Sequence, residues 1–228
     1  MPKPTKKLSS QEQAQESDPV CLNFHDIILR SKDINILKGP HWLNDQIIAF
    51  YFSYLKKLKC KNNSDILFVA PAVTQCMKFI SQEELTTMLK DLNAGSKMFI
   101  LFALNDNITA LAGGSHWSLL ALSRPERTFY HFDSLCDQNV SAASQLIHQV
   151  KAALNCKRYK LKTMKCLQQT NTYNCGIHVL CMAEKIVDYV NIFKHMDGVG
   201  QLKQETVDGK RAKLLKLIVT LGGKHVSV

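Results

Sequence analysis

The chain has 228 residues, which is enough for one sizeable domain and short for two. Hydrophobic residues make up 46% and charged residues 21%, a balance that excludes an intrinsically disordered protein. No apolar run approaches the roughly 18–20 residues that cross a bilayer, and no apolar stretch follows the first lysines as in a secretory signal. We therefore expect a cytosolic or nuclear protein with no membrane partner, whose eight cysteines are mostly small buried side chains.

The formal net charge of +10 is unevenly distributed. Residues 151–165 carry six basic side chains and no acidic one, and residues 203–228 carry six against two. Such stretches can attract nucleic acid or an acidic protein face. Because basic stretches are more often solvated surface, we do not expect a nucleic-acid partner. Nothing in the sequence indicates an assembly larger than a monomer.

The beginning of the chain differs in composition from the rest. Residues 1–18 are rich in Lys, Ser, Gln and Glu and nearly free of large apolar side chains, which predicts a disordered tail. The hydrophobic rhythm is continuous over residues 19–228, without repeats or a second linker, and this predicts a single domain.

Three helices are predicted in the first half of the domain. Asn44 or Asp45 can cap a helix that runs to about Leu58. A proline at the first turn opens a second helix over residues 71–80. A Ser-Gln-Glu-Glu capping box then begins a third, short helix over residues 81–90.

Strands and two further helices follow. The segments predicted as strands are apolar, or alternate apolar with polar residues, between turn signals: 97–104, 115–122, 128–135 and 159–163. The second and third of these are joined around Arg124-Pro125, which indicates an antiparallel pair. An apolar helix over 175–190 and a basic amphipathic helix over 209–221 complete an α+β domain, with a central antiparallel or mixed sheet flanked by helices.

Cys175 is the cysteine placed for reaction. The polar, turn-prone segment 169–174 leads into the apolar helix that begins near Cys175, where the positive end of the helix macrodipole favours thiolate. Gly176 allows other backbone or substrate to approach closely. A buried structural cysteine is the alternative interpretation. A zinc site with His178 and Cys181 is disfavoured, because the helical period spreads the three side chains apart, so we expect no metal.

A thiolate nucleophile needs a histidine that keeps it ionised and later donates a proton, and that histidine is oriented by a carboxylate or amide. If the strand connection centres near residue 125, the numbers of paired residues sum to about 250, and His116 lies within about one residue of Asp133 across the sheet. His116 and Asp133 are therefore candidates for the rest of a triad. His131 competes for both roles from the same strand face as Asp133. Alternatively, His116 is a satisfied core histidine and Asp133 caps a turn.

The segment around His116 also suggests how a substrate is held. Gly113 and Gly114 open a loop, and Trp117 follows the histidine. An enzyme that cuts after a Gly-Gly tail needs a narrow slot, and the flat indoles of Trp42 and Trp117 can form its walls. The alternative places both tryptophans in the core.

Together these residues resemble the ubiquitin-like-protein-specific cysteine proteases, the sentrin/SUMO protease family. The resemblance implies the papain-like fold of these enzymes over residues 19–228. Within the family, the compact size and the Asn105-Asp106-Asn107 stretch resemble the deneddylase branch, which removes the Nedd modifier. The matching stretches follow the family's order: Trp42–Asp45, Gly113–Leu120, His131–Ser134 and Gln169–Gly176.

The resemblance implies a catalytic role for four residues. Cys175 is the expected nucleophile, His116 the general base and acid, and Asp133 the residue that orients the histidine. Gln169 is expected to donate its side-chain amide to the oxyanion, together with the Cys175 backbone N–H. The reaction requires no metal or cofactor.

The resemblance also implies contacts with the substrate. Trp42 and Trp117 are expected to cover the modifier's C-terminal glycines. Asp45 is expected to bind near the modifier's tail, although helix capping explains this residue equally well. The loop Asn105-Asp106-Asn107 is expected to belong to the same binding region.

The chain departs from the family pattern at two positions. Asn174 stands where the family usually has aspartate, and Thr172 stands where it usually has glycine or another small residue. A β-branched residue is unfavourable if that position needs a positive φ. Neither change removes a chemical group from the implied mechanism.

The implied substrates are a Nedd-type modifier and its protein conjugates, cullins among them. A SUMO-specific protease is the alternative within the family. A catalytically weak module that binds a ubiquitin-like tail is the alternative from another class.

Overall fold

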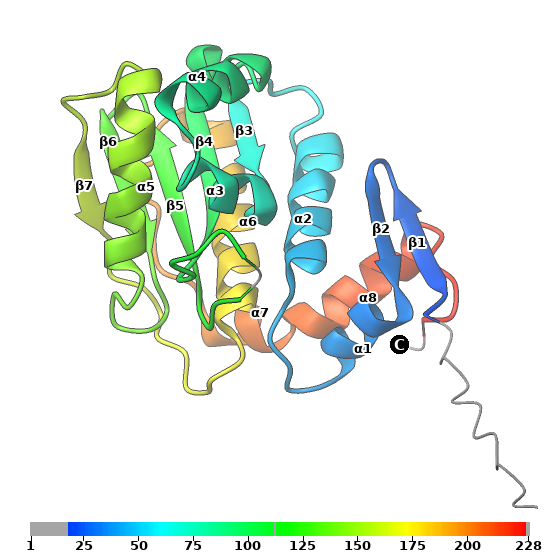
Figure 1. Cartoon of the computed structure of the whole chain (residues 1–228). Helices are drawn as coiled ribbons and strands as arrows, with labels where there is room; N and C mark the ends of the chain where they lie inside the picture. The colour runs from blue at the N-terminus through cyan, green and yellow to red at the C-terminus, as the bar shows by residue number, and fades with distance from the viewer. Residues whose placement is uncertain (1–17, 112, 227–228) are drawn as a thin grey trace, which may run out of the picture.

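The computed structural model describes residues 18–111 and 113–226, and a five-stranded sheet runs through its centre (Figure 1). The two outer strand pairs are parallel and the two inner pairs are antiparallel. The sheet is therefore mixed and the fold is α+β, as the sequence predicts. The strands lie in the order β3 (Ile66–Val69), β4 (Phe99–Asn105), β5 (Trp117–Ser123), β6 (Thr128–Phe132) and β7 (Lys160–Thr163).

Helices that connect the parallel strands cover one face of the sheet. Parallel neighbours cannot be joined by a tight hairpin, so each pair needs a crossover. The crossover from β3 to β4 contains α3 (Pro71–Met77), α4 (Gln82–Asp91) and a 3₁₀ turn (Ala94–Ser96), and that from β6 to β7 contains α5 (Val140–Ala153). Their apolar side chains form one hydrophobic core with this face of the sheet.

A second core covers the opposite face. It contains α2 (Asp45–Tyr54), which continues into a π-helical turn (Leu55–Lys59), and α6 (Cys175–Phe193). Because both faces are covered, every residue of β4 and β5 is buried, which explains their almost unbroken apolar sequences. No helix in the described part of the chain is long and apolar enough to span a membrane.

Apart from α7 (Gln204–Asp208), which packs against α6, the remaining elements lie at one side of this layered body (Figure 1). A two-stranded hairpin packs on the start of α2, and a C-terminal helix packs against α1. The elements are β1 (Val20–Phe24), β2 (Ile27–Arg30), α1 (Ser31–Lys38), α7 (Gln204–Asp208) and α8 (Lys210–Thr220).

Several details of the predicted elements can be compared with the structure. Asn44, and not Asp45, caps α2, because its Oδ1 accepts the backbone N–H of Ile47 at 3.1 Å. The capping box predicted at the start of α4 is present. On β5 and β6, Leu119 faces Phe132, which differs by one residue from the predicted register. The strand predicted over 115–122 begins later, at Trp117, and the strand predicted over 128–135 ends earlier, at Phe132.

The predicted tail falls largely on residues 1–17, which lie outside the described residues. Asp18, placed in that tail by its composition, is bound to the domain. Its carboxylate accepts the backbone N–H of Lys32 at 3.1 Å and lies 3.2 Å from the Lys32 ammonium. The described domain therefore includes Asp18.

The basic segment 151–165 lies over the end of α5 and the sheet edge formed by β7. Lys160 and Lys162 of β7 are exposed. Lysines on an edge strand oppose pairing with another sheet, so this charge has a structural explanation as solvated surface.

Candidate active site

Three elements bring the predicted triad to one end of the sheet. Cys175 is the first residue of α6, His116 directly precedes β5, and Asp133 directly follows β6. Because β5 and β6 are antiparallel neighbours, the start of one lies beside the end of the other, and α6 packs across β5. The exposed fractions of Cys175, His116 and Asp133 are 1%, 2% and 1%.

The loop before Cys175 is held by its own polar groups. The Asn171 Oδ1 accepts the backbone N–H groups of Tyr173 at 3.1 Å and of Asn174 at 2.9 Å. Asn174 occupies the N-cap position of α6, but its side chain makes no capping bond. The unpaired N–H groups of the first turn and the macrodipole therefore favour negative charge at this end of α6. Thr172 is not among the described residues with positive φ, so its β-branched side chain introduces no backbone strain there.

The imidazole of His116 is oriented by a buried carboxylate. His116 Nε2 lies 2.6 Å from Asp133 Oδ1, which leaves Nδ1 for the thiol. The same Oδ1 accepts the backbone N–H of Leu135 at 2.9 Å, and Oδ2 accepts that of Asn139 at 2.8 Å. Three donors thus fix the carboxylate, and the carboxylate fixes the ring.

Charge in the site is stabilised by these contacts. Burial by itself lowers the pKa of His116, but its interactions with Asp133 and Cys175 are stronger together and raise the pKa to about 9. Burial raises the pKa of Asp133, but the bonds from His116 and from the two backbone N–H groups hold it below its usual value. At neutral pH the site therefore holds an imidazolium against a carboxylate, which is the state that can donate a proton to a leaving amine.

This arrangement predicts the alkaline limb of the pH–rate profile. Because the raised pKa keeps His116 protonated to higher pH, kcat/KM is expected to stay level above neutral pH and to fall as the pH rises through about 9. Initial rates measured between about pH 6 and pH 10 test this. A decline that already begins near the ordinary histidine value of about 6.5 would contradict it.

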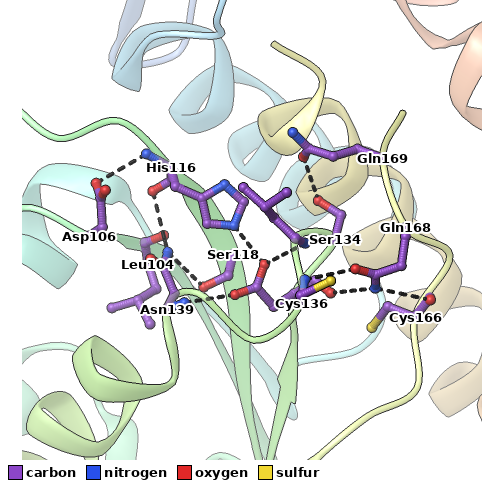
Figure 2. A network of polar contacts seen from close by, with 12 residues as sticks. Leu104, Asp106, His116, Ser118, Ser134, Cys136, Asn139, Cys166, Gln168 and Gln169 are labelled. Carbon is purple, nitrogen blue, oxygen red and sulfur yellow. Dashed lines mark hydrogen bonds and ion pairs between the residues drawn. The ribbon is translucent and has the colours of Figure 1, made fainter. Parts of the chain in front are cut away.

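A second carboxylate holds the segment that carries His116. Asp106 Oδ1 accepts the backbone N–H groups of Ser115 at 2.6 Å and of His116 at 3.0 Å, and Oδ2 accepts the Ser115 hydroxyl at 2.6 Å. Burial raises the pKa of Asp106, but these bonds outweigh it and the pKa is lowered. Asp106 was predicted to lie in a substrate-binding region, and in the structure its carboxylate is turned toward its own loop (Figure 2).

Replacing Asp106 with alanine is expected to lower kcat/KM by about 10–100-fold, because two backbone N–H groups lose their acceptor and His116 is held less firmly. Asp106→Asn is the matched control. Its remaining oxygen can keep both backbone bonds, so it is expected to lose less than about threefold. Steady-state kinetics on the two variants distinguish the outcomes, and equal activity of Asp106→Ala and wild type would refute this role.

Gln169, the predicted oxyanion donor, lies beside the strand end that carries Asp133. Its backbone N–H donates to the Ser134 carbonyl at 2.8 Å, and its Oε1 accepts the Ser134 hydroxyl at 2.8 Å (Figure 2). Its Nε2 donates to the Asn171 carbonyl at 2.6 Å. Among the described residues no partner takes the second N–H of this amide, so that donor is available to an oxyanion.

Two further polar residues support the site and were not predicted. Asn139 is 1% exposed, and its Nδ2 donates to the His116 carbonyl at 3.3 Å and to the Ser118 hydroxyl at 3.1 Å. Gln168 Nε2 donates to the Asp133 carbonyl at 3.2 Å. A cap-type residue directly before the apolar pattern of α5 is the sequence signal that marks Asn139.

The two tryptophans do not share one environment. Trp117 is 8% exposed, and its indole Nε1 donates to the Leu43 carbonyl at 3.0 Å, whereas Trp42 is 49% exposed. Trp42 is therefore not a core residue. Gly176 explains how the Trp42 segment reaches α6, because a Cβ on Gly176 would lie 2.8 Å from the Leu43 Cβ.

A cleft of about 550 Å³ opens beside Trp117 and is lined by Asp45, Asn105 and Asn107 together with apolar side chains of α3. Lys78, which is buried, donates from Nζ to the Asn105 carbonyl at 3.0 Å and the Asn107 carbonyl at 2.6 Å. Gly114 closes the loop with a φ of +92°, and a Cβ there would lie 1.8 Å from Asn105 Oδ1, so this position requires glycine. The structure thus gathers these predicted binding residues around one cleft.

His131 and His178, the histidines named in the alternative interpretations, are both buried. His131 is fully buried and bonds to the Ser118 hydroxyl at 3.0 Å, and burial lowers its pKa. Burial also lowers the pKa of His178 to about 4. Within the described residues no three His, Cys, Asp or Glu side chains gather in a group that could hold a metal ion.

Comparisons with known proteins identify the family of this chain. The model of the Ulp1 protease family, C-terminal catalytic domain, matches residues 41–226. The chain is 36% identical over 213 residues to sentrin-specific protease 8 of Homo sapiens, covering 91% of this chain and 100% of that protein. It is 30% identical over 223 residues to NEDD8-specific protease 1 of Arabidopsis thaliana, covering 92% of this chain and 97% of that protein.

Among solved structures, the fold is similar to the C-terminal Ulp1 protease domain in complex with Smt3, the yeast orthologue of SUMO. The TM-score is 0.70 at 20% identity, covering 92% of this chain and 90% of that one, so this likeness concerns the fold. Since the family model spans most of the sequence and both relatives align over nearly their full length, the chain belongs to the Ulp1 family of cysteine proteases.

Proposed function

We propose that this protein cleaves the bond that follows the C-terminal glycine pair of a NEDD8-type modifier. The observation that carries the proposal is the buried arrangement of Cys175, His116 and Asp133, with the Nε2–Oδ1 distance of 2.6 Å, beside an open cleft. Relatives named sentrin-specific protease 8 and NEDD8-specific protease 1 support the choice of modifier. The leaving group is an amine in a precursor and in a conjugate, so one site can process both.

The first half of the reaction is an acyl transfer. The Cys175 thiolate attacks the carbonyl carbon of the modifier's terminal glycine, and the carbonyl oxygen becomes an oxyanion. The Cys175 backbone N–H and the available Gln169 N–H donate to that oxygen, and in another enzyme the loss of one such donor costs about 10²–10³ in rate. His116 then gives its proton to the leaving nitrogen as the C–N bond breaks, and a thioester remains on Cys175.

The second half releases the modifier. Neutral His116 accepts a proton from water, and the resulting hydroxide attacks the thioester carbonyl. This attack gives a tetrahedral intermediate. Its collapse breaks the C–S bond, frees the modifier's carboxyl group and restores the thiolate–imidazolium pair. Asp133 keeps the ring in one orientation through both halves.

The cleft suggests how the modifier's tail is held. Gly113 and Trp117 both line this cleft, and a glycine in the wall leaves space that a side chain would fill. Asp45 also lines the cleft, and burial raises the pKa of its carboxyl group. A basic residue in the tail ahead of the glycine pair would provide the missing counter-charge and favour the ionised form.

Protein conjugates of the modifier, cullins among them, are the proposed physiological substrates. The modifier supplies the residues that enter the cleft, so the conjugated protein need only present a lysine at the end of the slot. Specificity for individual conjugates therefore depends on surfaces outside the catalytic groove.

Modifier probes with a C-terminal electrophile test the proposal. NEDD8, SUMO and ubiquitin versions are incubated with the full chain and with its Cys175→Ala variant. We expect a Cys175-dependent adduct with the NEDD8 probe. An adduct with the SUMO probe alone would show that the protein is a cysteine protease whose substrate is SUMO and not NEDD8. Binding of a probe without any adduct would indicate a module that holds the modifier's tail and does not cleave it.

A further inference from the structure

Arg211, the second residue of α8, joins two distant parts of the chain. Its Nη1 donates to the Ile36 carbonyl at 2.8 Å, and its Nη2 donates to the His41 carbonyl at 2.6 Å. On its other side the guanidinium contacts Asn174 Oδ1, from Nη2 at 3.2 Å and from Nε at 3.4 Å, and Nη2 lies 3.5 Å from the Tyr173 carbonyl.

These contacts place Arg211 between the two segments that form the site. His41 directly precedes Trp42, and Asn174 directly precedes Cys175. One planar side chain with a fixed set of donors therefore sets the distance between a proposed wall of the slot and the nucleophile. A flexible ammonium could not make these bonds in the same geometry.

No carboxylate in the described part of the chain neutralises the charge of Arg211. No Asp or Glu oxygen among the described residues lies within ion-pair distance of its guanidinium, and the side chain it contacts at position 174 is an amide. Its neighbour Lys210 differs, because its ammonium lies 2.7 Å from a Glu184 oxygen. Burial lowers the pKa of Arg211, and its interactions with Tyr173 and Cys175 oppose that change.

Few of the ionisable groups around the thiol are cationic at neutral pH. Burial lowers the pKa of His178 to about 4, so this ring is neutral, and burial raises the pKa of Cys166 to about 11, so this thiol keeps its proton. Among the described residues, the cationic groups that interact with Cys175 are therefore the His116 imidazolium and the Arg211 guanidinium. The groups that face it come from separate elements: His116 with Asp133 behind it, His178 on α6, Cys166 on the preceding loop, Tyr173 beside it and Arg211 on α8.

We propose that Arg211 is a positioning residue of this active site, a role that rests on the function proposed above. It holds the Trp42 segment against the nucleophile loop. Because Asn174 is uncharged, it does not form an ion pair with the Arg211 guanidinium. The positive charge of the guanidinium can therefore stabilise the Cys175 thiolate. An aspartate at position 174 would pair with Arg211 and withdraw much of that charge from the sulfur.

The test measures the thiol without a substrate. Iodoacetamide alkylation of Cys175 in the full chain is followed by mass spectrometry of its peptide across a range of pH, which separates it from the other cysteines. Arg211→Gln and Asn174→Asp are each expected to raise the pH of half-maximal alkylation by about one unit. Lys216→Gln, which removes an exposed charge from the same helix, is the matched control. Its pH of half-maximal alkylation is expected to stay within about 0.2 unit of the wild-type value.

Arg211→Lys separates charge from geometry. It is expected to leave the alkylation midpoint near that of wild type, and to lower kcat/KM by about tenfold because the bonds to the His41 and Ile36 carbonyls are lost. Asn174→Asp conserves size and adds an ion pair, so it tests the charge even where Arg211→Gln fails to fold. An unchanged midpoint in Asn174→Asp would overturn the electrostatic role. Since alkylation needs no modifier, the alkylation midpoints do not depend on whether the NEDD8 probe reacts, whereas the kcat/KM of Arg211→Lys does.

Discussion

Replacing Cys175 with alanine is expected to lower kcat/KM for a NEDD8-derived substrate by about 10⁵-fold, because the sulfur is the atom that bonds to the carbonyl carbon. Modifier binding is expected to stay within about twofold of wild type, since the cleft residues are unchanged. The loss of a small buried group costs about 1 kcal/mol of folding free energy, which a stable domain tolerates. Steady-state kinetics and calorimetric binding to the modifier measure the two effects.

Cys181→Ala is the control for this substitution. Cys181 is also buried in α6, with an exposed fraction of 2%, but it lies well along the helix from its N-terminus. It is expected to show a similar loss of stability and nearly full activity. Loss of both cleavage and binding in Cys175→Ala would mean that the substitution disrupts the fold.

The second large effect is expected for Asp133→Asn, which should lower kcat/KM by about 10³–10⁴-fold. Asp133 accepts from three donors, and an asparagine has one oxygen with which to do so. With that oxygen toward His116 and Leu135, the amide NH₂ faces the backbone N–H of Asn139 and leaves it unpaired, at a cost of about 1–3 kcal/mol of stability. The reversed orientation turns the NH₂ toward the ring and favours the wrong tautomer.

This variant also loses the negative charge that supports the imidazolium. Removing it lowers the pKa of His116 from about 9, so the alkaline limb of the pH–rate profile is expected to move to lower pH. Asp137→Asn removes the same charge from a nearby exposed residue and should leave both rate and profile close to wild type. An alkaline limb that stays near pH 9 in Asp133→Asn would show that Asp133 is not the group that raises the pKa of His116.

Local chemistry in the sequence predicts much of the molecule. The capping box at Ser81, the proline that opens α3 and the apolar run that forms β4 depend on neighbouring residues, and each appears in the structure. The pairing of β5 with β6 was predicted to within one residue, because a short connection between two apolar strands leaves few registers. The Cys–His–Asp set follows from the same kind of reasoning, since a reactive cysteine requires partners of known type.

Elements that depend on distant partners were not predicted. β3 has only four residues and becomes a strand by pairing in parallel with β4, and β1 and β2 form a separate hairpin. α5 was missed although its apolar positions follow a helical period, and it is the crossover that lets β6 and β7 run parallel. Which of two adjacent polar residues caps α2 was also decided by geometry that composition does not specify.

The sequence by itself determined the α+β class and the family, and it predicted the nucleophile and its partners, because these depend on residue type, order and short-range spacing. Only the tertiary structure decided that Asp106 and Asn139 hold the His116 segment, that Lys78 anchors the cleft loop and that Arg211 reaches across to Asn174. These polar side chains could equally have been solvated. Because an unpaired polar group is costly once the fold buries it, each of them pairs with a group that is distant in the sequence. The spacing of residues in the sequence does not predict such distant pairs.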